Sequence, residues 1–392
     1  MEESRFARRL QNMGGNAIRE LLKVTQRPDI ISFAGGNPAP DTFPAEQLGE
    51  IAQEVLARDR NILQYGTTEG YAPLREYIAH WVSDIGIKAA ASDVLVTSGS
   101  QQGIDLLGKA MLNPGDKVVL EDPTYLAALQ IFRTYEGTFI TVPSDAHGVL
   151  LEELEEAIAR EKPALVYLVP TFQNPTGITL SLERRKKLAD IVAGHSVVTI
   201  EDDPYGRLRY SGESLPAIKS FDHNGEIVYL GSFSKLVSPG LRVGFAIASP
   251  AILQKMVIGK QSTDVHTSNL SQIMIYEFCK RGLLEPHLEE SRAKYARKLD
   301  IMTEQLSLFP DNIKWTTPEG GLFIWGELPE TMDAAKLFAA ALEEKVAFVP
   351  GTSFFAGGGH TNTIRLNFSN ASEEMIREGM QRLAKVYAKF GQ

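Results

Sequence analysis

Seven short apolar runs recur between positions 94 and 248, and several of them are continuous rather than alternating. Continuous apolar runs are typical of strands that are buried on both faces of a sheet. Segments with helical character, such as Leu151–Arg160 and Leu182–Ala193, lie between the runs. This alternation predicts an α/β fold with a seven-stranded, mostly parallel sheet between layers of helices. The runs are Val94–Thr97, Val118–Glu121, Phe139–Val142, Ala164–Val169, Val197–Glu201, Ile227–Gly231 and Val243–Ala248.

The pattern changes after a long helical stretch that runs from about Glu285 to Leu306. Shorter elements follow it, and they mix strand and helix character. This α+β pattern predicts a second, smaller domain after the long helix. The elements are Gly321–Glu327, a helix through Ala334–Glu344, Ala347–Pro350 and Thr363–Phe368.

Composition and charge narrow the class of protein. Among 392 residues, 40 are Lys or Arg and 49 are Asp or Glu, which gives a net charge of −9. We expect no nucleic-acid partner, because phosphate binding needs excess positive charge. We expect no membrane span, since no apolar run approaches the ~18 residues required, and no secretory signal at Met1–Leu10. The single cysteine, Cys279, indicates a reducing, cytoplasmic location. No metal site is predicted.

The segments directly after five of the runs are unusually polar. In α/β sheets, ligands gather beyond the carboxyl ends of the strands. We therefore expect these segments to converge on one site. They are Ser98–Gly103, Asp122–Tyr125, Pro170–Gly177, Glu201–Tyr205 and Ser232–Lys235.

Two of these segments could hold a phosphate. Ser98–Gly103 follows a strand and opens a helix, where glycine and free N–H groups favour an anion, although an ordinary strand-to-helix turn explains it equally well. It is neither a G-x-G-x-x-G nor a Walker A motif. Ser232, Ser234 and Arg242 offer two hydroxyls and a guanidinium to a phosphate. Lys235 is then free to attack a carbonyl; the alternative is a surface lysine beside a solvated loop.

A carboxylate and a phenol spaced three residues apart, Asp202 and Tyr205, fit a pyridoxal cofactor. Its pyridine nitrogen stays protonated only beside an anion, and its ring oxygen needs a hydrogen-bond donor. The alternative is an Asp-Pro turn. Tyr125 could stack on such a ring or be an ordinary core or rim tyrosine. We hypothesise that the Asn174–Pro175 bond is cis, which would aim Asn174 inward.

Taken in order, these motifs resemble the signature of the fold-type I pyridoxal-phosphate aminotransferases. The resemblance covers essentially the whole chain, and it is closest to the 2-aminoadipate/kynurenine aminotransferase branch through segments 17–22, 32–38, 63–66, 69–75, 98–103, 229–235, 318–323 and 347–351. The signature is Asn174-Pro175-Thr176-Gly177, Asp202-x-x-Tyr205, Ser232-x-Ser234-Lys235 with Arg242, and Arg365.

The resemblance implies the fold-type I transferase architecture. A large domain over residues 46–285 would bind pyridoxal 5'-phosphate (PLP), and residues 286–392 would form a smaller domain. Residues 1–45 would contribute to the small domain. The protein would be a homodimer with shared active sites.

The resemblance also assigns roles around the cofactor. Lys235 would form the Schiff base and then move the substrate's proton, while Asp202 would keep the pyridine nitrogen protonated. Tyr205 and Asn174 would bond the ring oxygen, and Tyr125 would stack on the ring. The phosphate would be bound by Ser100, Gln101, Ser232, Ser234 and Arg242, with Tyr65 reaching it from the partner subunit.

Substrate contacts follow from the same resemblance. Arg365 would bind the α-carboxylate in a bidentate pair, assisted by Asn174 and the backbone of Gly36; a surface arginine is the alternative. Arg19 would meet a distal carboxylate or swing away for apolar side chains, although it could also be a plain helix-surface arginine.

The implied activity is transfer of an amino group from an L-amino acid (2-aminoadipate, aromatic or aliphatic) to a 2-oxo acid, 2-oxoglutarate being the expected acceptor, by a ping-pong mechanism. Two alternatives stay open. One is another PLP enzyme on this fold, a lyase or decarboxylase. The other is a non-catalytic amino-acid-sensing module of a transcription regulator. We expect no helix-turn-helix domain of the kind such regulators carry, because the resemblance already begins at Ala17.

Overall fold

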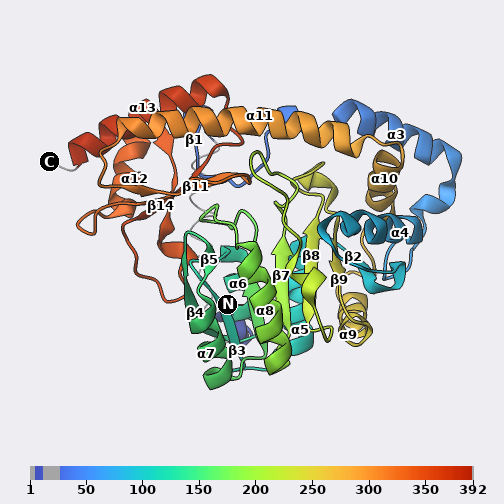
Figure 1. Ribbon diagram of the computed structural model, residues 1–392. Coiled ribbons are helices and arrows are strands. Elements are labelled where there is room, and N and C mark those ends of the chain that lie inside the picture. Colours follow the sequence, from blue (N-terminus) through green and yellow to red (C-terminus); the bar gives the residue numbers. More distant parts are fainter. Residues whose placement is uncertain (1–4, 12–26, 391–392) are drawn as a thin grey trace.

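The computed structural model describes residues 5–11 and 27–390, and its centre is an eight-stranded sheet (Figure 1). The strand order is β2-β9-β8-β7-β6-β3-β4-β5. β9 runs antiparallel to β2 and to β8, whereas the β3, β4, β6, β7 and β8 pairs are parallel. The strands are β2 (Val94–Thr97), β3 (Lys117–Asp122), β4 (Thr138–Asp145), β5 (Gly148–Val149), β6 (Leu165–Leu168), β7 (Thr199–Asp203), β8 (Ile227–Ser232) and β9 (Gly244–Ile247).

All seven apolar runs form strands of this sheet, and the mostly parallel α/β fold is confirmed. The sheet has one strand more than expected. β5 is a two-residue strand that pairs antiparallel with the end of β4. Two residues are too few to make a hydrophobic pattern, so β5 leaves no signal in the sequence.

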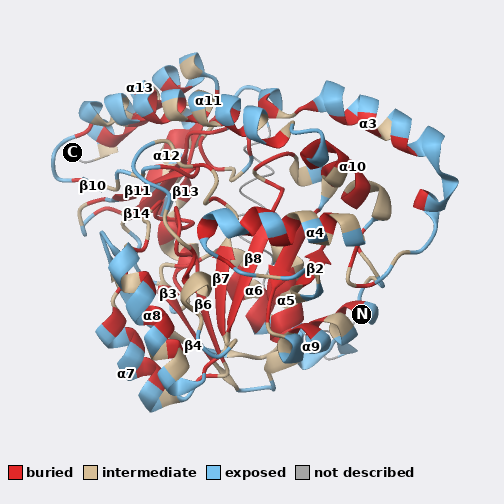
Figure 2. Cartoon of the chain, turned by 45° about the vertical axis from the view of Figure 1, so that its right-hand side comes forward, coloured by how far each residue is buried: buried red, intermediate tan, exposed pale blue. Residues whose placement is uncertain are grey.

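Helices cover both faces of the sheet because successive strand residues point to opposite sides. In β3, Val118 and Leu120 pack with α5, α6 and α9, whereas Val119 packs with α7 and α8. Figure 2 shows the buried residues concentrated in the strands and the exposed ones on the outer faces of the helices. These helices are α5 (Ser100–Met111), α6 (Leu126–Thr134), α7 (Leu151–Glu161), α8 (Leu182–His195) and α9 (Pro250–Gln261).

A second, four-stranded sheet of order β10-β11-β14-β13 lies beside the first. Its neighbouring strands are antiparallel. The expected strand over Ala347–Pro350 is divided at Phe348, because its two halves pair with different partners: β12 with β1, and β13 with β14. The strands are β1 (Ile31–Ser32), β10 (Lys314–Trp315), β11 (Phe323–Glu327), β12 (Val346–Ala347), β13 (Val349–Pro350) and β14 (Thr363–Asn367).

The long helical pattern forms α11, which runs along the top of the molecule in Figure 1 and packs against α13. A large apolar cluster joins α11 and the second sheet to α3, α4 and α10 and to strands β2 and β9. Within residues 5–11 and 27–390, no helix is both long and apolar enough to cross a membrane. The remaining helices are α1 (Arg8–Gln11), α3 (Ala45–Arg58), α4 (Ala72–Trp81), α10 (Asn269–Lys280), α11 (Leu284–Gln305), α12 (Ala334–Glu343) and α13 (Glu373–Phe390).

Strand β9 lies directly against the turn that opens α5. A Cβ added at Gly244 would lie 2.6 Å from the Gly99 carbonyl carbon and 2.7 Å from the Ser100 nitrogen. We predict that Gly244→Ala lowers the free energy of unfolding by about 1–3 kcal/mol, because backbone atoms must shift. Gly49→Ala is the matched control: Gly49 lies on the exposed face of α3 with nothing within 4 Å. It should raise stability by about 0.5–1 kcal/mol. Urea unfolding measures both, and equal stability of the two variants would contradict this packing.

Candidate active site

A cavity of about 450 Å³ opens where the ends of the large-sheet strands face β14 of the second sheet. The structure brings together in its walls every proposed site residue that it describes, except Tyr65. The polar segments after β2, β3, β6, β7 and β8 all reach it. The proposed residues in the wall are Gly36, Ser100, Gln101, Tyr125, Asn174, Asp202, Tyr205, Ser232, Ser234, Lys235, Arg242 and Arg365.

Lys235 follows the end of β8 and projects its amine into the cavity. Its Nζ donates to the carbonyl oxygen of Gly36 at 2.7 Å. Desolvation, together with the nearby charges of Arg242 and Arg365, lowers the Lys235 pKa to about 8. An amine with this pKa is partly neutral near pH 7–8, so it can act as a nucleophile or a base.

Asp202 lies in β7, on the same face as Tyr167 of β6. The Tyr167 hydroxyl donates to Asp202 Oδ2 at 2.8 Å, and Oδ1 is buried without a hydrogen-bond partner in the described structure. Burial raises the Asp202 pKa to about 7. A cationic N–H group placed against Oδ1 would favour the ionised form.

Tyr205 and Asn174 both line the cavity. Burial raises the Tyr205 pKa above its usual range, and its ring meets Phe323 edge-on with the centroids 5.8 Å apart. The Asn174–Pro175 bond is cis, and Asn174 Oδ1 accepts a hydrogen bond from Arg365. Burial also raises the pKa of Tyr125, the residue just before α6, to about 12. Both phenols therefore stay protonated and can donate hydrogen bonds at neutral pH.

The opposite end of the cavity is suited to an anion. α5 begins at Ser100 without a side-chain cap, and the preceding Gly99 has φ +84°. The positive φ favours glycine, and a Cβ at Gly99 would lie 2.5 Å from Arg242 Nη2 and would displace the guanidinium. Arg242 donates to the Ser98 carbonyl at 3.0 Å and to Ser234 Oγ at 3.4 Å. Free N–H groups at a helix start, a guanidinium and a hydroxyl together favour a phosphate.

Arg365 lies in the middle of β14, between Trp325 of β11 and Val349 of β13. Its guanidinium donates to Asn174 Oδ1 and to the Ala34 carbonyl, both at 2.7 Å, and Nε has no partner in the described structure. No carboxylate among the described residues pairs with it, although Arg365 is only 5% exposed. Burial lowers its pKa to about 10, which still leaves it cationic at neutral pH. A buried cation of this kind fits the carboxylate of a ligand.

Two proposed residues are not placed in the cavity. Tyr65 is 80% exposed, and its ring meets that of His266 edge-on with the centroids 5.8 Å apart. Arg19 lies outside the described residues.

Sequence reasoning missed several residues that shape the site. Tyr167 holds Asp202, the Ala34 carbonyl holds Arg365, and the rings of Phe323 and Phe354 lie 4.4 Å and 4.9 Å from the Arg365 guanidinium carbon. Tyr167 had a usable signal: it is a tyrosine in an otherwise aliphatic strand, and a buried hydroxyl needs a partner. A backbone carbonyl such as that of Ala34 leaves no signal in the sequence.

Comparison with known proteins agrees with this geometry. The family model "Aminotransferase class I and II" matches residues 28–383. An aromatic-amino-acid aminotransferase of Thermococcus litoralis is 44% identical, with 98% of this chain and 94% of that protein covered. A 2-aminoadipate transaminase of Thermus thermophilus is 45% identical, with 97% and 96% covered. The crystal structure of a Pyrococcus horikoshii kynurenine aminotransferase superposes with a TM-score of 0.95 at 44% identity, covering 99% and 98%.

These matches support an aminotransferase. They do not favour the two alternatives, a lyase or decarboxylase on this fold and an amino-acid-sensing module. The residues present also fit the cofactor that the family uses: an unpartnered buried carboxylate oxygen at Asp202, a reactive amine at Lys235 and an anion cradle at Gly99 and Arg242. The chain therefore belongs to the aminotransferase class I and II family and is a PLP-dependent aminotransferase with the fold-type I architecture.

Proposed function

We propose that the enzyme moves the amino group of an L-amino acid (2-aminoadipate, aromatic or aliphatic) to a 2-oxo acid, with 2-oxoglutarate as the expected acceptor, by a ping-pong mechanism. The observation that carries this proposal is Arg365: a buried guanidinium without a carboxylate partner among the described residues, in the wall of the cavity that holds the Lys235 amine. The relatives named for aromatic amino acids and 2-aminoadipate support the choice of substrates.

The residues divide the chemistry among them. When bound, PLP supplies an electron sink for charge that develops at the substrate Cα. Asp202 favours a protonated ring nitrogen through its free Oδ1, and Tyr167 holds the carboxylate in place. Lys235 would take the proton from the substrate Cα and deliver it to the C4′ carbon of the cofactor. In this proposal Tyr205 and Asn174 orient the cofactor's ring oxygen, and Tyr125 stacks on the ring.

Binding energy is supplied at the two ends of the cavity. Ser100, Gln101, Ser232, Ser234 and Arg242 hold the phosphate at one end. At the other end Arg365 holds the α-carboxylate, with Asn174 Oδ1 fixing the orientation of its guanidinium and the Gly36 backbone alongside. We also propose that Arg19 meets the distal carboxylate of a dicarboxylic substrate.

We propose the following domain division: residues 46–285 form the large domain, and residues 286–392 form the small domain together with residues 1–45. The parallel pairing of β1 with β12 supports the contribution of the N-terminal segment to the small domain. We place the enzyme in the cytoplasm, because its single cysteine, Cys279, is buried and unpaired.

Lys235 provides the first test. After loading with PLP and reduction with borohydride, mass spectrometry of the wild-type enzyme should find the cofactor on the peptide that contains Lys235. Lys235→Ala should lose this adduct, and its transamination rate should fall by a factor of about 10²–10⁴ because the variant lacks the base. The exposed Lys88→Ala serves as control and should behave as wild type. An adduct on a different lysine, with Lys235→Ala fully active, would contradict the assignment.

We further propose that two chains form a dimer and that Tyr65 reaches the phosphate of the partner subunit. Tyr65 lies near other exposed apolar side chains: Leu63 is 71% exposed, and Val265, next to His266, is 46% exposed. Exposed apolar groups that gather in this way mark interaction surfaces.

Hybrid dimers test the shared site. Tyr65→Ala should bind PLP more weakly, and Lys235→Ala should be inactive. When the two variants are unfolded, mixed and refolded together, hybrid dimers should recover one intact site and therefore show activity at low PLP concentration that neither variant shows alone. If Tyr65 served its own subunit, mixing would restore nothing, and the proposal would fail.

A further inference from the structure

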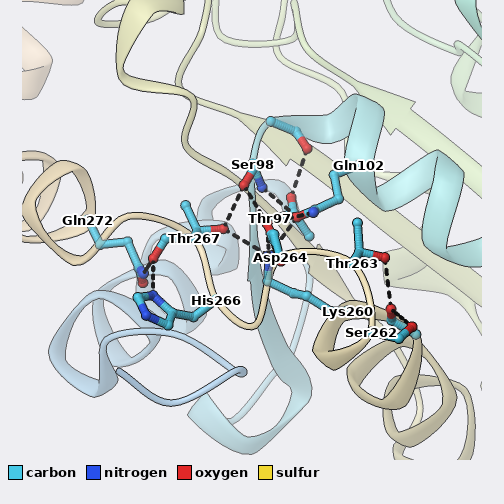
Figure 3. Close-up of polar contacts among 12 residues, drawn as sticks. Thr97, Ser98, Gln102, Lys260, Ser262, Thr263, Asp264, His266, Thr267 and Gln272 are labelled. Atoms are coloured by element: carbon cyan, nitrogen blue, oxygen red, sulfur yellow. Dashed lines mark hydrogen bonds and ion pairs between the residues drawn. The ribbon is translucent and has the colours of Figure 1, made fainter. Parts of the chain in front are cut away.

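A partly buried network of polar side chains lies beside the turn that opens α5 (Figure 3). Its centre is Lys260, near the end of α9, whose side chain is 0% exposed. Lys260 Nζ donates to Gln102 Oε1 at 2.6 Å, to both carboxylate oxygens of Asp264 at 2.9 and 3.0 Å, and to Thr267 Oγ1 at 3.1 Å. A fully buried ammonium is costly unless it is paired, so this network is a specific arrangement rather than a solvated surface contact.

The network fixes Ser98 at its nitrogen and its hydroxyl. Gln102 Oε1 accepts from the Ser98 N–H at 2.8 Å, while Gln102 Nε2 donates to Asp264 Oδ2 at 2.8 Å. The Ser98 hydroxyl donates to Asp264 Oδ2 at 3.0 Å and lies 3.2 Å from Thr267 Oγ1. Lys260 thus acts on Ser98 through Gln102 and Asp264.

The third polar atom of Ser98, its carbonyl oxygen, is held from the cavity side. It accepts from Arg242 Nη2 at 3.0 Å, and Gly99 and Ser100 follow directly in the chain. Gly99, Ser100 and Arg242 line the cavity, whereas Ser98, Gln102, Lys260 and Asp264, although all described, do not. With its N–H, hydroxyl and carbonyl all bonded, Ser98 can set the direction of the N–H groups that follow it.

We propose that the Lys260–Asp264 ion pair is a positioning device for the cofactor phosphate: through Gln102 and Ser98 it fixes the Gly99–Ser100 turn against Arg242. The proposal rests on the proposed assignment of this turn to the phosphate. The pair also keeps the local charge balanced. Without Lys260, the Asp264 carboxylate would be left unpaired close to an anion site, and like charges repel.

Two ligands separate this role from a merely structural one. PLP and pyridoxal both bond to Lys235, but only PLP carries the phosphate. The ratio of their dissociation constants from the apoenzyme therefore isolates the phosphate contribution. Lys260→Met should weaken PLP binding by about 10–100-fold, the range seen when outer partners of metal ligands are removed. It should leave pyridoxal binding within about twofold of wild type, since the ring contacts do not involve the network.

Two further variants complete the design. Ser98→Ala removes only the hydroxyl that bonds Asp264, so this variant should fold even if Lys260→Met does not. It should weaken PLP binding by about tenfold and leave pyridoxal binding unchanged. Lys109→Met is the matched control: Lys109 is exposed and donates to Thr263 Oγ1, in the same loop as Asp264, at 2.5 Å, but it makes no hydrogen bond to Ser98, Gln102 or Asp264. Its dissociation constants for both ligands should equal those of wild type.

The outcomes are distinct. If Lys260→Met and Ser98→Ala leave the PLP-to-pyridoxal ratio at the wild-type value, or weaken both ligands equally, the positioning role is overturned. Arg242→Leu tests the underlying assignment separately. If that variant also leaves the ratio unchanged, the phosphate site itself is misassigned; if it lowers the preference for PLP while the network variants do not, only the inference about Lys260 fails.

Discussion

The site depends on ionisable groups that the enzyme buries without supplying all their hydrogen-bond and charge partners. Among the described residues, Asp202 Oδ1 has no hydrogen-bond partner and Arg365 has no carboxylate partner, and Lys235 lies beside two other cations. Each arrangement is unfavourable in the free protein, because burial disfavours charge and like charges repel. As a result, the pKa of Asp202 is raised and the pKa values of Arg365 and Lys235 are lowered, and each shift favours the neutral form of the group. A cationic ring nitrogen would pair with Asp202, and an anionic carboxylate would pair with Arg365. Because these contacts remove the cost of the unpaired buried groups, they favour binding of ligands that carry both charges.

The fold maintains this arrangement by dividing it between two sheets. Asp202 lies in β7 and Lys235 follows the end of the neighbouring strand β8, so both reach the cavity wall. Arg365 comes from the centre of β14 in the second sheet, and its bond to Asn174 ties the two parts together at the cavity. The Lys260 network extends the same principle outward, since it fixes the α5 turn from the side away from the cavity.

The sequence was sufficient for the sheet and for most of the candidate site. Continuous apolar runs located seven strands, and polar residues after them identified Asn174, Asp202, Tyr205 and Lys235, because strand ends in such sheets face the ligand. It could not reveal β5 or the break at Phe348, which depend on pairing with distant strands. The partners that hold the site were also hidden. The Ala34 carbonyl is backbone, and Lys260 and Asp264 are ordinary charged residues until the fold buries one against the other.

The role of Arg365 is tested by the preference of the PLP-loaded enzyme for L-phenylalanine over 2-phenylethylamine, an amine that differs from phenylalanine only in lacking the α-carboxylate. Stopped-flow half-reactions of wild type and Arg365→Lys would give the two specificity ratios. Because Arg365→Lys loses a bidentate, charge-assisted contact, its preference for phenylalanine should be about tenfold to a hundredfold lower than that of wild type. Its rate with the amine should change little. An equal preference in wild type and Arg365→Lys would show that the buried guanidinium does not bind the substrate carboxylate.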